Sequence, residues 1–189
     1  MLEWSIEAVA GADSVGQIVV ALPPGEEGRL AARDDLHIVA GGPTRAESVA
    51  NALAATEAEV VVIQDAARPL VTPALVDDVV GRLLADDSLA GAIAVAAVTD
   101  TIKRVENAGE EVAETIDRDS LRAAQTPQAF RADALRKAIE AADAPAATDE
   151  AMLVEAAGGR IALVEAPGPN PKVTGPDDLV AVGALLAAR

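Results

Sequence analysis

The stretch VVVIQDAARP, residues 60–69, sets an apolar run directly against an acid and a base. The run Val60–Ile63 consists of β-branched residues, which is typical of a strand buried on both faces of a parallel sheet. Asp65 then lies beyond the carboxyl end of that strand, at the edge where open α/β sheets bind ligands. A carboxylate there suits Mg²⁺, which one or two acids share with substrate phosphates. The alternative is that Asp65 caps a turn or pairs with Arg68.

The rest of the chain alternates strand patterns with helical patterns. Strands are predicted at Gln17–Leu22, Leu36–Ala40, Glu59–Ile63, Ala92–Val98 and Arg160–Glu165. Helices are predicted to begin at Thr44, at Thr72-Pro73, at Thr148–Glu150 and at Thr174–Asp177. Each of these starts has the residues of an N-cap or a capping box. The alternation predicts an α/β fold with a Rossmann-like, mostly parallel sheet and helices on both faces, in one domain over residues 1–189.

Residues 98–116 break this alternation. They form two extended runs around Glu106–Gly109, which is the pattern of a β-hairpin. The hairpin is rich in charge and has too few apolar residues for a core of its own, and a two-stranded ribbon alone is only marginally stable. We therefore expect it to protrude and to pack on a second chain or a neighbouring lobe.

Charge and composition narrow the classes of function. The 189 residues include 31 Asp and Glu against 15 Lys and Arg, a net charge of −16. This balance argues against nucleic acid or an anionic membrane as a partner, because both require basic surfaces. Cysteine is absent and His37 is the single histidine, so thiol catalysis, disulfides and zinc clusters are excluded or nearly so. No apolar run reaches membrane-spanning length and no signal-peptide pattern is present, so we expect a cytoplasmic protein with small-molecule partners.

Two further segments have the chemistry of phosphate binding. Gly41-Gly42-Pro43-Thr44 is a glycine turn between a predicted strand and a helix N-terminus, where free N–H groups and the helix dipole favour phosphate. Lys172 follows a predicted strand in the loop 170–174. The simpler interpretation of Lys172 is an exposed loop charge, and that of Arg118 is a surface charge at the start of a helix.

Six segments together resemble one family. They are GGPTRAESVANAL, IQDAARPLVTP, VTDTIKRV, RDSLRAAQTPQAF, TDEAMLVEAAG and NPKVTGPDDL. Their order and spacing resemble those of the 2-C-methyl-D-erythritol 4-phosphate cytidylyltransferases, the CTP-using enzymes of the non-mevalonate isoprenoid pathway, over essentially the whole chain. Ribitol-phosphate cytidylyltransferases share a diluted version of these motifs, so a polyol phosphate is the alternative acceptor.

The resemblance implies a fold of the nucleotide-diphospho-sugar transferase type and a reaction with Mg²⁺ as cofactor. In that reaction the phosphate of methylerythritol 4-phosphate attacks the α-phosphorus of CTP and expels pyrophosphate. The residues that it implicates are Asp65, Arg118 and Lys172 in catalysis, with Asp65 also as the metal ligand; Thr101, Thr126 and Arg68 in substrate binding; and Gly41, Gly42, Ser48 and Ala66 in nucleotide binding. In the family the hairpin, here about residues 98–116, embraces a second subunit, so the resemblance also implies a homodimer.

The chain departs from the family pattern in three places. Gln64 stands where His is usual, and Pro43 stands where Asp or a small residue is common. The chain opens at residues 1–6, MLEWSI, already within a predicted helix, whereas the family begins with a central strand and a Gly-rich loop bearing an Arg and a Lys. We expect about thirty residues to be missing, two neighbouring strands to be unpaired around a slot, and the 189-residue chain to be inactive without those cations. The alternatives are a compact variant that needs no such loop and a non-catalytic remnant.

Overall fold

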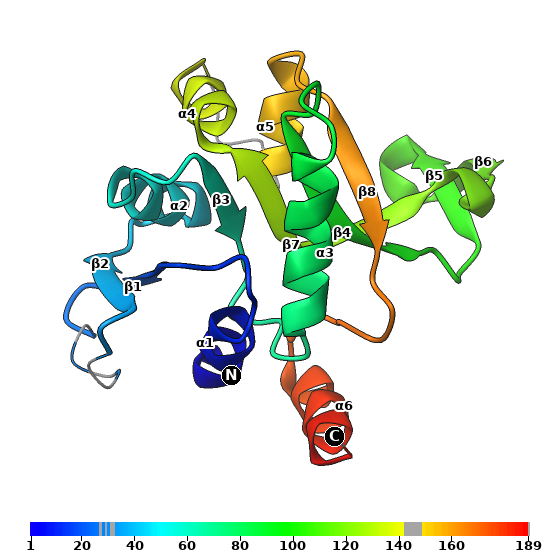
Figure 1. Cartoon of the computed structure of the whole chain (residues 1–189). Helices are drawn as coiled ribbons and strands as arrows, with labels where there is room; N and C mark the ends of the chain where they lie inside the picture. Colours follow the sequence, from blue (N-terminus) through cyan, green and yellow to red (C-terminus); the bar gives the residue numbers. More distant parts are fainter. Residues whose placement is uncertain (27, 29, 31–32, 142–148, 189) are drawn as a thin grey trace.

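The structure is a computed structural model that describes residues 1–26, 28, 30, 33–141 and 149–188 (Figure 1). Its helices are α1 (Leu2–Ala10), α2 (Arg45–Ala54), α3 (Pro73–Leu84), α4 (Ala132–Ala141), α5 (Glu150–Ala156) and α6 (Pro176–Ala187). Its strands are β1 (Ile18–Leu22), β2 (Leu36–Ala40), β3 (Val60–Ile63), β4 (Gly91–Ala97), β5 (Ile102–Glu106), β6 (Glu111–Ile116), β7 (Arg122–Arg131) and β8 (Ile161–Glu165). Two short 3-10 turns are η2 (Asn107–Gly109) and η3 (Arg118–Ser120). The predicted α/β fold class is confirmed.

The central sheet has four strands in the order β3-β7-β4-β8. Strands β4 and β8 are parallel, whereas β7 is antiparallel to both of its neighbours, β3 and β4. Consequently β3, β4 and β8 run in one direction and β7 runs against them. The five predicted strands all form within one residue of their expected bounds, but the sequence patterns missed β7.

Strand β7 contains Pro127, which by itself argues against a central strand because proline cannot donate to the ladder. The pairing of β7 with β4 shifts in register between Ile93 and Val95. Pro127 falls at this irregularity and has no partner in the ladder of either neighbour. No ladder hydrogen bond is lost there, and the strand continues through the proline.

Helices cover both faces of the central sheet (Figure 1). On one face, Ala92 and Ala94 of β4 pack in a cluster with Leu83 of α3. On the other face, Ile93 of the same strand packs in a cluster with Leu135 of α4. Because successive side chains of a strand point to opposite faces, β4 takes part in both cores.

Strands β1 and β2 form a second, parallel, two-stranded sheet. Ile18, Val20 and Leu22 of β1 pack with Ile6 of α1 on one face, and α2 contacts β1 as well. Within the described residues, β1 has no strand partner on its other edge and β3 has none on the edge away from β7. The expectation of two unpaired strands around a slot is therefore confirmed for β1 and β3.

The helix starts agree with their predicted signals. Thr44 and Glu47 form the capping box of α2, and Thr72 caps α3, which begins at Pro73. The predicted start at Thr148 lies outside the described residues, and α5 is capped by the side chain of Asp149. These caps place the helix N-termini beside the carboxyl ends of the strands.

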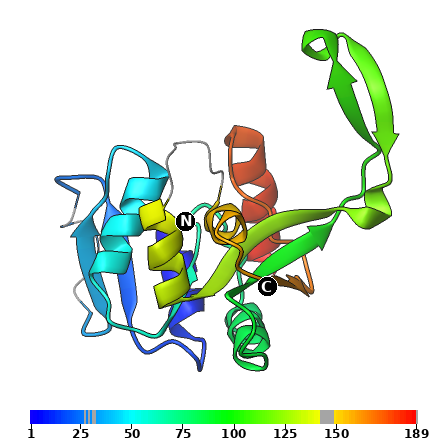
Figure 2. The same cartoon turned by 90° about the horizontal axis from the view of Figure 1, so that it is seen from above.

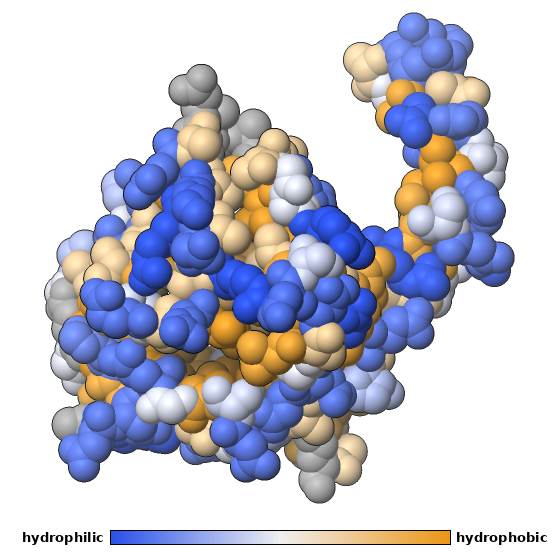
Figure 3. All heavy atoms as spheres, turned by 45° about the horizontal axis from the view of Figure 1, so that its top comes forward, coloured by the Kyte–Doolittle hydropathy of each residue, from blue (hydrophilic) through white to orange (hydrophobic). Residues whose placement is uncertain are grey.

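The predicted hairpin is confirmed as β5 and β6, joined by η2. It stands away from the body of the protein as an arm (Figure 2). Val105 and Val112 on the arm are 55% and 58% exposed, and apolar residues lie among charged ones along its length (Figure 3).

Within the described residues, no helix is both long and apolar enough to cross a membrane.

Candidate functional site

Asp65 lies in a tight turn directly after β3. The Arg68 N–H donates to the Asp65 carbonyl oxygen at 3.0 Å, and Gln64 Nε2 donates to the same oxygen at 3.0 Å. The turn folds the chain back, so Arg68 Nε lies 3.9 Å from the Asp65 carboxylate. The turn and the ion pair with Arg68 are thus both present, at the sheet edge where a ligand site was predicted.

Two further cations reach Asp65 from distant parts of the chain. Lys172 Nζ lies 2.9 Å from Oδ2, and Arg45 Nε lies 3.3 Å from Oδ1. Arg45 is the first residue of α2, and Lys172 lies in the loop between β8 and α6. Three basic side chains of this acidic chain therefore converge on one carboxylate, whose side chain is 14% exposed. Clustered cations at a cleft attract an anionic ligand.

The charge state of Asp65 follows from this arrangement. Burial alone would raise the pKa of its carboxyl, but the hydrogen bond from Lys172 and the charges of Arg45 and Lys172 together outweigh burial. The pKa of Asp65 is therefore lowered from 3.8, and the side chain is ionised at neutral pH.

A second acid fixes Arg45 from the opposite side. Glu150, the first residue of α5, has a side chain that is 3% exposed, and its Oε1 lies 2.6 Å from Arg45 Nη1. Burial alone would lower the pKa of the Arg45 guanidinium, but Glu150 and Asp65 raise it on balance. Arg45 thus joins α5 to the turn after β3, and its guanidinium is held at the sheet edge.

Hydrogen bonds connect the turn to β7 and to the loop before α6. The Asp65 N–H donates to Thr126 Oγ1 at 3.0 Å, and Asn170 Nδ2 donates to the Thr126 carbonyl at 2.8 Å. Arg68 Nη1 in turn donates to the Asn170 carbonyl at 2.8 Å. These contacts join the turn after β3, strand β7 and the loop before α6 around the carboxylate.

Several buried polar atoms around this network have no hydrogen-bond partner in the described part of the chain. They are Gln64 Oε1, Arg68 Nε, Gln128 Oε1, Glu150 Oε2 and Asn170 Oδ1. Buried polar atoms are normally satisfied, so these five atoms leave hydrogen-bonding capacity unused beside the carboxylate. All of them belong to residues of the network or border the cavity beside it.

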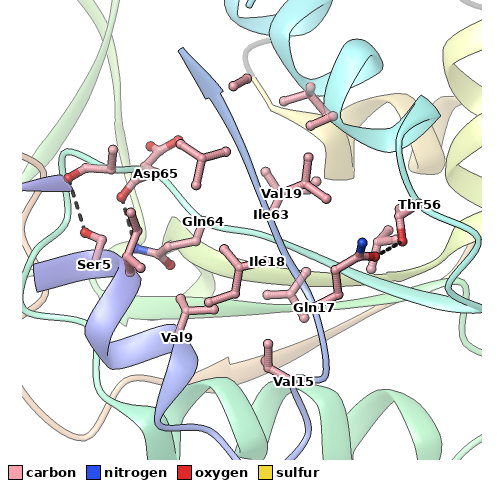
Figure 4. Close-up of a pocket in the computed structure, with 18 of the residues that line it drawn as sticks. Ser5, Val9, Val15, Gln17, Ile18, Val19, Thr56, Ile63, Gln64 and Asp65 are labelled. Carbon is pink, nitrogen blue, oxygen red and sulfur yellow. Dashed lines mark hydrogen bonds between the residues drawn. The ribbon is translucent and has the colours of Figure 1, made fainter. Parts of the chain in front are cut away.

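Two cavities meet at Asp65. The smaller, of about 230 Å³, lies between Asp65 and the residues Thr126 and Asp149. The larger, of about 850 Å³, runs from Asp65 between β1 and β3 (Figure 4). Arg45, Asp65 and Lys172 line both cavities. Gln64 lines the larger cavity and Gln128 lines the smaller one, so a ligand bound there can contact the cations and one of these amides.

The structure brings together some of the residues that the sequence implicated. Asp65, Arg68, Thr126 and Lys172 line the smaller cavity. Ser48 and Ala66 line the larger cavity near Asp65. The proposed roles of these residues in binding and catalysis stay predictions.

Gly41 and Gly42 line neither cavity and shape the turn before α2. The Gly42 N–H donates to Ser48 Oγ at 3.1 Å, and a Cβ on Gly42 would clash with the Cβ of Glu47. Glycine is therefore required at position 42 by the close approach of α2. Contact of these two glycines with a nucleotide stays a prediction.

Arg118 and Thr101 lie apart from the other predicted residues. Both are exposed, at the base of the arm, and Arg118 Nη1 donates to the Thr99 carbonyl at 2.6 Å. Neither residue lines the cavities at Asp65. Their proposed roles in catalysis and substrate binding stay predictions.

Arg45, Glu150 and Asn170 were not among the site residues that the sequence predicted. Arg45 had a detectable signal, because the capping box at Thr44 places it in the first turn of a helix at the carboxyl edge. The pairing of Arg45 with Glu150 joins residues 105 positions apart and had no local signal.

The fold and the site define an α/β protein of the nucleotide-diphospho-sugar transferase type. The carboxyl edge of its sheet carries cations and a helix N-terminus, groups that can bind a phosphate, around the carboxylate of Asp65. The chain belongs to the 2-C-methyl-D-erythritol 4-phosphate cytidylyltransferase (IspD) family, whose model matches residues 1–188.

Individual relatives agree with this assignment. The chain is 44% identical to the bifunctional enzyme IspD/IspF of Anaeromyxobacter dehalogenans, over 100% of this chain and 50% of that protein. It is 42% identical to the 2-C-methyl-D-erythritol 4-phosphate cytidylyltransferase of Frankia casuarinae, over 99% of this chain and 70% of that protein. The chain thus spans about half the length of the bifunctional relatives that it matches. The crystal structure of the corresponding Thermus thermophilus enzyme superposes with a TM-score of 0.82 at 36% identity and covers 98% of this chain and 88% of that one.

Proposed function

We propose that this site transfers the cytidylyl group of CTP to 2-C-methyl-D-erythritol 4-phosphate and releases pyrophosphate. The observation that carries the proposal is the convergence of Arg45, Arg68 and Lys172 on Asp65 at the carboxyl edge of the sheet. The family of the chain and the names of its relatives support the identity of the two substrates. No feature of the site favours ribitol phosphate as the acceptor.

The chemistry requires positioning and charge neutralisation more than covalent catalysis. An oxygen of the acceptor phosphate forms a bond to the α-phosphorus of CTP while the bond to pyrophosphate breaks. In the structure Lys172 and Arg45 contact Asp65, and a bound phosphate would take over these charge-assisted hydrogen bonds. Lys172 would then hold the acceptor phosphate, and Thr126 would contact it from β7. Ser48 and Ala66, with the turn at Gly41 and Gly42, would form the side that faces the nucleotide.

Mg²⁺ is part of this proposal. Within the described residues there is no group of three or more His, Cys, Asp or Glu side chains that could hold a metal alone. Asp65 is a single carboxylate whose oxygens both contact cations. The donor set therefore fits an ion that one carboxylate shares with nucleotide phosphates. Bound in this way, Mg²⁺ would neutralise negative charge on those phosphates.

The dependence on nucleotide gives the metal proposal a test by calorimetry. When Mg²⁺ is titrated into the protein without CTP, we expect no binding tighter than a millimolar Kd, which corresponds to a binding free energy of about −4 kcal/mol. With CTP present, Mg²⁺ should bind, and Asp65→Asn should weaken that binding because an amide is a poorer ligand for a hard cation. Tight Mg²⁺ binding without nucleotide would contradict the shared site.

A homodimer through the arm completes the proposal. Arg118 and Thr101 lie outside the cavities of their own chain, at the base of an arm with exposed valines. A two-stranded ribbon needs a partner surface to be stable. We therefore place these two residues in the site of the second subunit, where Arg118 would hold the acceptor phosphate from the side opposite Lys172.

Mixing two inactive variants tests this arrangement. Arg118→Ala and Lys172→Ala chains are unfolded together and refolded to form mixed dimers. If the arm acts across the dimer, each mixed dimer has one intact site, and about a quarter of the parent activity returns. If Arg118 acts within its own chain, no site is intact and no activity returns.

The overall proposal is tested by pyrophosphate release from CTP, Mg²⁺ and methylerythritol 4-phosphate, with ribitol 5-phosphate as the competing acceptor. The assay uses the 189-residue chain and an extended chain, in which the N-terminal strand and Gly-rich loop of another family member precede residue 1, since we expect added cations to be needed for turnover. Faster release with methylerythritol 4-phosphate supports the proposal. Faster release with ribitol 5-phosphate, or none in either form, would contradict it.

A further inference from the structure

Arg45 lies between two acids that differ in their other partners. Its Nη1 lies 2.6 Å from Glu150 Oε1, and its Nε lies 3.3 Å from Asp65 Oδ1. Asp65 also contacts Lys172 and Arg68, so it stays paired if Arg45 turns away from it. Glu150 differs, because Arg45 is the one side chain of the described residues that forms a hydrogen bond with its carboxylate. Glu150 is therefore the main partner of Arg45, and Asp65 is a partner that can be exchanged.

Glu150 is suited to hold Arg45 because it is buried. Its side chain is 3% exposed, and its Oε2 has no hydrogen-bond partner in the part of the chain that the structure describes. It is the first residue of α5, where the helix dipole favours an acid. A buried carboxylate that lost its cation would be strongly unfavourable, so this ion pair is harder to break than a pair at the surface.

Arg45 occupies a position that is unfavourable for a cation on its own. It is the first residue of α2, where the free N–H groups and the helix dipole oppose a positive charge. The capping box of this helix is formed by Thr44 and Glu47 and does not use the arginine. An acid from another element therefore has to keep the guanidinium at this helix end, and Glu150 does so.

The contact with Glu150 leaves one edge of the guanidinium for a ligand. A guanidinium is planar and donates in fixed directions, with Nε and Nη2 on the same edge. Nη1 donates to Glu150, Nε has only the longer contact with Asp65, and Nη2 forms no hydrogen bond with a described residue. Arg45 lines both cavities at Asp65. An anion bound there can accept from Nε and Nη2 together, as phosphate does in bidentate pairs with arginine.

We propose that Glu150 is a positioning residue that holds Arg45 by Nη1, so that the edge with Nε and Nη2 is free to move from Asp65 to a phosphate of the incoming nucleotide. This inference rests on the proposed function, which supplies the nucleotide. Without Glu150, the guanidinium would either swing away from the sheet edge or pair with Asp65 through both Nε and Nη2. In both cases fewer donors would face the phosphate.

The sign of one substitution tests the proposal. Glu150→Ala removes a negative charge beside the site, so electrostatics alone predicts tighter binding of an anionic nucleotide. Positioning predicts the opposite: in calorimetric titration, CTP with Mg²⁺ should bind this variant more weakly than the parent by about fivefold or more. Unchanged or tighter binding would overturn the proposal.

A matched control is Glu155→Ala, which removes an exposed acid from the same helix. This variant should bind CTP like the parent, because Glu155 lines neither cavity at Asp65. A loss of affinity equal to that in Glu150→Ala would overturn the proposal. Circular dichroism confirms that both variants fold.

Two further variants separate positioning from a merely structural role. Glu150→Gln keeps an oxygen that can accept from Arg45 Nη1, so it should retain an affinity for CTP much closer to that of the parent. In an Arg45→Ala background, Glu150→Ala should cause no further loss, because Glu150 acts through Arg45. An affinity in Glu150→Gln as weak as that in Glu150→Ala would overturn the proposal. A full additional loss in the double variant would do the same.

Hydrogen exchange of the Arg45 Nε–H, followed by NMR, tests the contact without any nucleotide. We expect exchange to be faster by about tenfold or more in Glu150→Ala and unchanged in Glu155→Ala. Equal exchange in Glu150→Ala and the parent would overturn the proposal. A parent chain that binds no CTP would contradict the proposed function and, with it, this role. A parent that binds CTP no more tightly than Glu150→Ala does would contradict the role of Glu150 alone.

Discussion

Strands β4 and β1 are both short, apolar and largely buried, but they differ in their neighbours. Strand β4 pairs with β7 on one edge and with β8 on the other, and helices cover both of its faces. Strand β1 pairs with β2 alone, and its other edge faces a cavity. Apolar side chains are thus sufficient to pack a strand against helices, but they do not satisfy the backbone at an open edge. The candidate site lies where the two halves of the protein meet, the half built on the four-stranded sheet and the half built on β1 and β2.

The largest expected effect concerns the cations at that meeting point. Lys172→Ala should lower pyrophosphate release in the extended chain by about 10²- to 10³-fold, because a preorganised charge at the reacting phosphate is lost. Lys137→Ala, an exposed lysine of α4, is the control and should have no effect. If the rate of pyrophosphate release in Lys172→Ala stayed within about twofold of the parent, Lys172 would have no role in catalysis. A tenfold change in rate corresponds to about 1.4 kcal/mol.

A second prediction compares the cores of the two halves. Leu135→Ala, in the cluster between β7 and α4, should lower the free energy of unfolding by about 3 kcal/mol. Ile6→Ala, beside the open slot, should cost about half as much or less, since fewer packed atoms lose a contact there. Urea unfolding of both variants measures the difference. Equal costs would mean that the slot is packed in solution.

A third prediction concerns the arm, which neither half needs for its core. Deletion of residues 100–114 should leave the thermal midpoint within a few degrees of the parent, because these residues are largely exposed. The same deletion should change a dimer into a monomer, as measured by light scattering. A dimer that survives the deletion would place the interface elsewhere.

The smallest expected effect is on the dependence of stability on pH. The folded-state pKa of Asp65 is lowered, so its contribution to stability is fully present above the unfolded pKa, about 3.9, and is lost as the pH falls through the folded value. Asp65→Asn should therefore flatten the fall in stability below about pH 4. Parallel curves for parent and variant, measured by thermal unfolding between pH 2 and 5, would show that the ion pairs do not form in solution.

Much of the site could be predicted because local signals coincided with the strand ends. The apolar run before Asp65 placed it at the ligand edge. Lys172 was implicated by the resemblance, since a lysine in a loop after a strand is also typical of an exposed charge. Strand β7 could not be predicted from pattern, since Pro127 disfavours a central strand and only the register irregularity opposite it makes the strand possible.

The contacts that orient the site were also beyond local pattern. Glu150 meets Arg45, and Asn170 meets Thr126, only after distant segments pack together. Charged residues are mostly exposed, so an isolated Glu at the start of a helix gives no indication of burial. Arg118 and Thr101, at the base of the arm, were implicated by the resemblance alone, and their roles stay predictions.

Calorimetric titration of CTP with Mg²⁺ into the 189-residue chain tests most directly whether the convergent cations form the nucleotide phosphate site, and it does not depend on turnover. We expect one CTP per chain, with affinity at least tenfold weaker in Arg45→Ala, about 1.4 kcal/mol, and unchanged in Lys137→Ala. The same affinity in the parent and in Arg45→Ala, or a similar loss in Lys137→Ala, would contradict the assignment.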